Sequence, residues 1–101
     1  MIIFAVVIPD DFFLEIMENG LPEQGIVNEG LIELSRELSI PLAATNDCHY
    51  IRREDAEAHE VLLCIQTGKT LEDRDRMRLG TNQFYLRSPE EMSDLFRKCP
   101  E

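Results

Sequence analysis

Hydrophobic positions at the start of the chain fall into blocks that predict a strand, a helix and a second strand. Phe12 to Ile16 is a short apolar run that predicts a buried strand. From Pro22 to Ser39, apolar residues recur at spacings of four, three and four, which places them on one face of a helix (Val27, Leu31, Leu34 and Leu38). Pro41 ends this helix, and Leu42 to Thr45 predicts a second strand. A strand, a helix and a strand over so short a distance predict a βαβ unit with parallel strands.

The second half of the chain predicts two further helices with an irregular segment between them. Glu54 to Thr67 reads as an amphipathic helix that ends at Gly68, and residues 69–82 are polar and irregular. The apolar face predicted for this helix is Ala58, Val61, Leu62 and Ile65. Phe84 to Leu86 predicts a short extended segment. Ser88 to Glu91 has the pattern of a capping box, which begins a last helix whose apolar face is Met92, Leu95 and Phe96.

These elements predict the α/β class, as a βαβ unit followed by helices. Two parallel strands need helices on both faces and neighbours at both edges. We therefore expect the unit to be incomplete on its own and to form part of a larger sheet or barrel.

Composition narrows the range of functions. The 101 residues support one small domain, and the net charge of −10 argues against binding nucleic acid through this chain alone. The arginines at 74, 76 and 78 alternate with acidic residues and predict a solvated loop. Three cysteines without close pairing predict no disulfide framework, which favours the reducing cytoplasm. The apolar run at residues 1–8 is too short to span a bilayer, so we expect no membrane association.

Asp47 and His49 are the candidate chemical residues. They lie two apart at the predicted end of a strand, so their side chains are expected to point the same way, with backbones about 7 Å apart. A carboxylate and an imidazole so placed can reach one divalent metal ion. The alternative is that Asp47 caps a turn and His49 is a partly buried polar residue.

Other residues with chemical side chains carry weaker predictions. Glu15, near the end of the first strand, is a candidate for the rim of the same site, with a solvent-facing carboxylate as the alternative. Cys48 and Cys64 are predicted to be small core residues, and His59 to be a packing residue of its helix.

Several motifs, in the same order, resemble bacterial DNA polymerase III α subunits over about residues 11 to 98. The most specific is Ala-Thr-Asn-Asp-Cys-His-Tyr, which looks like the last metal-ligand motif of that family's PHP (polymerase and histidinol phosphatase) domain. The matching stretches are residues 12–24, 27–34, 44–50, 52–71 and 84–92.

The resemblance implies a part of a distorted (β/α) barrel of PHP type, covering residues 11–68. Residues 69–101 would form a connector toward the polymerase palm, and residues 1–10 are atypical of the family. By position, Asp47 and His49 match two ligands of a site that holds zinc, manganese or iron in such domains. The remaining ligands and the catalytic aspartates of the polymerase would lie outside this chain.

The function implied is that of a segment of a replicative DNA-directed DNA polymerase, which uses magnesium. In some members of the family, the PHP domain is a 3′–5′ exonuclease. DNA, deoxynucleotides and other replisome subunits would bind through parts of the parent protein outside this segment, and the isolated chain is expected to be inactive. Two alternatives are a free-standing PHP-type phosphoesterase and a non-catalytic structural remnant.

Overall fold

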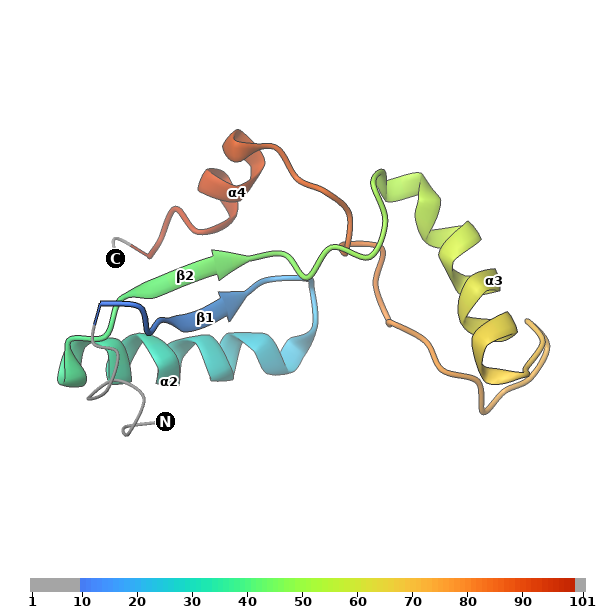
Figure 1. The fold of residues 1–101 in the computed structure, drawn as a ribbon, viewed down its shortest axis with the longest axis horizontal. Coiled ribbons are helices and arrows are strands. Elements are labelled where there is room, and N and C mark those ends of the chain that lie inside the picture. The colour runs from blue at the N-terminus through green and yellow to red at the C-terminus, as the bar shows by residue number, and fades with distance from the viewer. Residues whose placement is uncertain (1–9, 100–101) are drawn as a thin grey trace.

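The computed structural model describes residues 10–99, which form mixed α/β structure (Figure 1). The prediction for residues 1–10 therefore lies outside the described residues, apart from Asp10. The elements in chain order are β1 (Leu14–Met17), α2 (Pro22–Leu38), β2 (Leu42–Thr45), the short 3₁₀ helix η1 (Arg53–Asp55), α3 (Ala56–Thr67) and α4 (Pro89–Leu95).

The predicted βαβ unit is confirmed. β1 and β2 pair in parallel, with Leu14 opposite Leu42, and α2 runs beside them (Figure 1). β1 begins two residues later than the predicted strand because the pairing starts where the Leu14 amide donates to the Pro41 carbonyl, at 2.9 Å. Leu14 and Ile16 are buried, whereas Phe13 is half exposed.

Helix α2 confirms the predicted boundaries almost to the residue. Pro22 occupies its first turn, and Ser39 caps its end in the left-handed conformation, with φ 55°. The Ser35 hydroxyl donates to the Ile40 carbonyl at 2.6 Å, which ties the end of the helix to the entry of β2. The predicted apolar face is only partly covered, since Val27 is 55% exposed.

Helix α3 also forms as predicted, with Gly68 as its left-handed cap, but the face that it buries is not the predicted one. Leu63 and Cys64 are buried, while Val61, Leu62 and Ile65 are exposed. The buried side of the helix also contacts the segment that follows it. Glu60 pairs with Arg76 of that segment, and residues three and four positions after Glu60 share its side of the helix.

Tyr85 joins three parts of the chain. It forms an isolated parallel bridge with Tyr50, so the predicted extended segment at 84–86 does pair. Its hydroxyl accepts from Arg53 of η1 at 2.9 Å and donates to Glu91 at 2.8 Å. Glu91 in turn closes the predicted capping box of α4 with Ser88.

The described residues are more extended than a compact domain of this size. Their radius of gyration is 16.6 Å, against about 13 Å for a compact domain of ~100 residues. In Figure 1, α3 lies beyond the carboxyl ends of the strands, apart from α2 and α4. None of the helices within residues 10–99 has the length and apolar character needed to cross a membrane.

Candidate functional site

Asp47 and His49 lie in the segment that leaves the sheet, directly after the carboxyl end of β2. The strand ends at Thr45, and Asp47 adopts the left-handed region with φ 47°. The expectation that both residues continue the strand geometry is therefore wrong. Both side chains are exposed, so they are available to a ligand but are not aligned by strand geometry.

A buried pair of asparagines anchors this segment. Asn19, which follows β1, is fully buried and donates to the Asn46 carbonyl at 3.0 Å and to its side-chain oxygen at 3.1 Å. Asn46 then donates to the carbonyls of Gln83 and Tyr85, at 3.0 and 2.6 Å. This network fixes the segment against the ends of both strands. Neither asparagine was predicted as a site residue, although both follow short apolar strands and buried amides need hydrogen-bond partners.

The geometry of the His49 ring fixes which nitrogen can bind a ligand. Its Nδ1 lies 2.6 Å from the backbone carbonyl of Asp47. A carbonyl only accepts hydrogen bonds, so the neutral imidazole carries its proton on Nδ1. Nε2 is left with a free lone pair, which is the arrangement found in metal-binding histidines whose other nitrogen donates to a carbonyl.

Two aromatic rings flank the imidazole of His49. Phe84 meets it edge to face, with ring centroids 5.3 Å apart and planes at 83°. His59 of α3 meets it similarly, at 5.5 Å and 77°. The His49 amide also donates to the Phe84 carbonyl at 2.8 Å, so this segment holds both the backbone and the ring. His59 packs as predicted, but against the candidate site.

Glu15 makes its hydrogen bond between the two strands, and Cys48 is not the buried core residue that was predicted. The Glu15 carboxylate accepts from the Thr45 hydroxyl at 2.6 Å, on the exposed surface of the strands. Cys64 is buried as expected, whereas Cys48 is exposed, because its segment leaves the sheet before it can enter the core. The Cys48 thiol lies 3.5 Å from the Tyr85 carbonyl.

Asp47 and His49 could supply some, but not all, of the ligands of a metal site. Within residues 10–99, no three His, Cys, Asp or Glu side chains come together in an arrangement that could hold an ion. Asp47 and His49 supply one carboxylate and one imidazole with a free Nε2, which are chemically suitable ligands for zinc, manganese or iron. A closed site needs further ligands.

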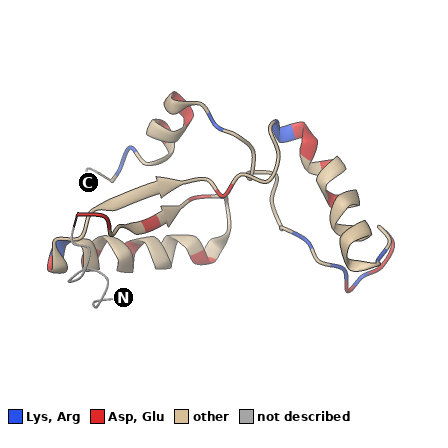
Figure 2. Cartoon of the chain, in the orientation of Figure 1, with Lys and Arg blue, Asp and Glu red and all other residues tan. Residues whose placement is uncertain are grey.

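An open cleft of about 600 Å³ lies between the start of α3 and residues 78–82. Tyr50 and His59 line it, together with Arg53 and Arg78 and three glutamates at 54, 57 and 60. Its charges are mixed, so it does not select for an anion. Figure 2 shows that basic and acidic residues are also interspersed along the rest of the described chain.

Two carboxyl groups away from this segment have lowered pKa values. The Ser88 amide and then the Tyr85 hydroxyl lower the pKa of Glu91, and the Thr70 amide and hydroxyl lower that of Asp73. Both carboxylates accept these hydrogen bonds in a cap or a turn, so the shifts reflect local structure.

Comparison with known proteins places the whole chain within one group of relatives. It is 48% identical to the DNA polymerase III subunit alpha of Borreliella burgdorferi over 98 residues, 97% of this chain and 8% of that protein. The Campylobacter jejuni subunit is 50% identical over the same share of both chains, and the Thermus aquaticus subunit 53% over 82% of this chain and 7% of that protein. No protein-family model matches the chain. The resemblance inferred from the motifs is confirmed, and the chain spans about 8% of the length of these relatives.

Proposed function

We propose that this chain is a segment of a bacterial replicative DNA polymerase, the DNA polymerase III α subunit, and that it contributes part of the PHP domain. The observation that carries the proposal is the identity of about half of all residues over nearly the whole chain. The parallel βαβ unit is consistent with a partial (β/α) barrel, and residues 69–101 would then lead toward the palm.

Within that domain, Asp47 and His49 would be ligands of a divalent metal ion, and Glu15 would stay at most at the rim. Three features support this role: the position of both residues beyond the carboxyl end of a parallel strand, their exposure, and the free Nε2 of His49. A bound metal would polarise a phosphodiester and activate water for 3′–5′ exonuclease action. The residues of this chain would hold and orient the ion, with the remaining ligands coming from elsewhere in the parent protein.

The polymerase reaction, its magnesium ions and its contacts with DNA, deoxynucleotides and other replisome subunits would belong to other parts of the protein. The net charge of −10 supports this division, because binding to phosphates needs clustered Lys and Arg. We infer that the protein acts in the cytoplasm, where the chromosome is replicated.

The test is to purify the complete protein that carries this sequence and to assay primer extension and 3′–5′ exonuclease activity separately. The proposal expects primer extension that survives the D47N/H49Q double substitution, with exonuclease activity lost. Matched control substitutions at exposed positions, E57Q and Q66A, should change neither activity. If the wild-type protein lacked exonuclease activity, the result would favour the alternative of a non-catalytic structural remnant. Phosphoesterase activity without primer extension would favour the free-standing enzyme.

A further inference from the structure

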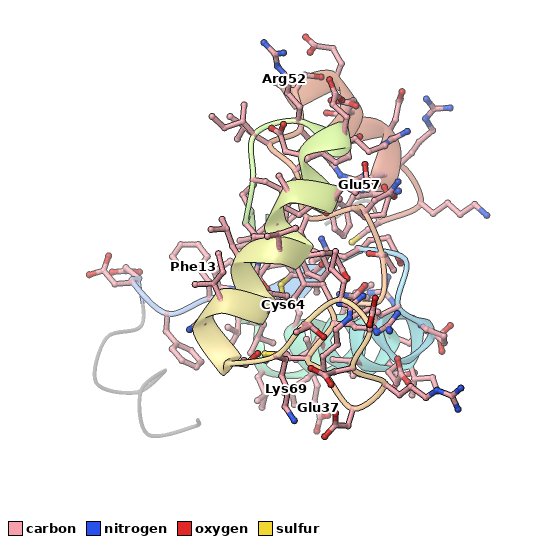
Figure 3. The ribbon with its side chains drawn as sticks, turned by 90° about the vertical axis from the view of Figure 1, so that its right-hand side faces the viewer. Phe13, Glu37, Arg52, Glu57, Cys64 and Lys69 are labelled. Atoms are coloured by element: carbon pink, nitrogen blue, oxygen red, sulfur yellow. The ribbon has the colours of Figure 1, made fainter. Side chains whose placement is uncertain are left out.

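One histidine outside the predicted ligand pair touches it. His59 lies in the second turn of α3, between Glu57 and Cys64, which Figure 3 labels on the helix that faces the viewer. Its ring meets His49 edge to face at 5.5 Å and meets Tyr50 at 5.4 Å. Within residues 10–99, His59 interacts through these two ring contacts, and neither of its ring nitrogens forms a hydrogen bond.

The ring of His49 is held on three sides. Asp47 accepts from Nδ1 at 2.6 Å, and Phe84 and His59 meet the ring at 83° and 77°. An imidazole on an exposed loop would otherwise rotate about its Cβ–Cγ bond, which would take Nδ1 away from the Asp47 carbonyl. Because the contacts come from different segments of the chain, they restrict this rotation.

We propose that His59 is a positioning residue, which holds the His49 ring so that Nδ1 donates to Asp47 and Nε2 stays available to bind metal. Within residues 10–99, His59 does not join Asp47 and His49 in a group of three side chains that could hold an ion. The inference rests on the proposed metal-binding role of His49. It adds that α3 controls the tautomer of that ligand. Partners that orient metal ligands typically change metal affinity by about 10- to 100-fold when removed.

The first readout needs no metal. In the complete protein that carries this sequence, with this segment alone ¹⁵N-labelled, the nitrogen shifts of His49 at pH ~8 report its tautomer. We expect Nδ1–H in the wild type and a detectable Nε2–H form in H59A. H59F keeps an aromatic edge against His49 without any ring nitrogen, so it should retain the wild-type tautomer. L62A, on the exposed side of the same helix, is the matched control and should also retain it.

The second readout is a Zn²⁺ titration of the same four proteins, followed through the His49 shifts. The midpoint in H59A should rise about tenfold, while H59F and L62A stay near the wild-type value. Wild-type behaviour of H59A in both readouts would overturn the inference, as would loss of the tautomer in a folded H59F. A tautomer change in H59A with no response of wild-type His49 to Zn²⁺ would instead support the positioning role and count against the proposed metal ligation.

Discussion

Replacing the buried Asn19 with alanine tests whether the amide network fixes the candidate segment. The Asn19 side chain makes three hydrogen bonds: two donated to Asn46 and one accepted from Gln24, at 3.0, 3.1 and 2.9 Å. Each such bond contributes about 0.5–1.5 kcal/mol net, and more when its loss leaves a buried partner unsatisfied. Asn46 is itself buried, so water does not readily replace the lost donor. We therefore expect N19A to lower the free energy of unfolding by about 2–4 kcal/mol.

Urea unfolding followed by circular dichroism measures this loss. With a slope of about 2 kcal/mol per molar urea, the midpoint of N19A should fall by about 1–2 M. N82A removes an exposed asparagine that accepts one bond from Gln83, and it should cost less than about 0.5 kcal/mol. If N19A shifted the midpoint no further than N82A does, the network would not be what holds the segment, and the reasoning would be wrong.

Three further changes test single features of the fold. S39G should stabilise the chain by about 0.5–1 kcal/mol, because glycine relieves the left-handed conformation at φ 55°, whereas S39A should give no gain in urea unfolding. L63A should cost about 2–4 kcal/mol and L62A less than about 0.5, by the same assay, and equal costs would contradict the observed face of α3. The pKa of Glu91 is lowered by the Ser88 amide first and the Tyr85 hydroxyl second, so its contribution to stability is present above the unfolded pKa and is lost as pH falls through the lower folded pKa. An acid titration of helical signal should therefore separate the wild type from E91Q near neutral pH, with a gap that shrinks as the pH falls below the ordinary value of 4.5 and through the lowered folded pKa, and a constant gap would refute this.

The local elements could be predicted from the sequence because their signals are local. Pro22 and Gly68 mark a helix start and a helix end, and Ser88 and Glu91 form the predicted capping box. The parallel pairing of the strands followed from the length of the helix between them. Such features depend on residues that are close together in the sequence, so they can be read from the sequence directly.

The errors arose where distant segments meet. The buried side of α3 is the side on which Glu60 pairs with Arg76, sixteen residues later, and periodicity along the helix contains no information about that pairing. The strand at 42–45 has the predicted bounds, but the chain after it leaves the sheet, where the side-chain amide of Asn46 binds the carbonyls of residues 83 and 85. As a result, Asp47 and His49 leave the strand geometry on which their predicted alignment depended. Their role as metal ligands remains a prediction.

The metal content of the complete protein that carries this sequence shows whether Asp47 and His49 bind a metal ion. The measurement is the molar ratio of zinc, manganese and iron to protein by mass spectrometry, for the wild type and for the D47N/H49Q variant, with E57Q as the matched exposed control. We expect at least one metal ion per wild-type and E57Q molecule, and a clear loss in the double variant. An equal metal content in all three proteins, or none in the wild type, would contradict it.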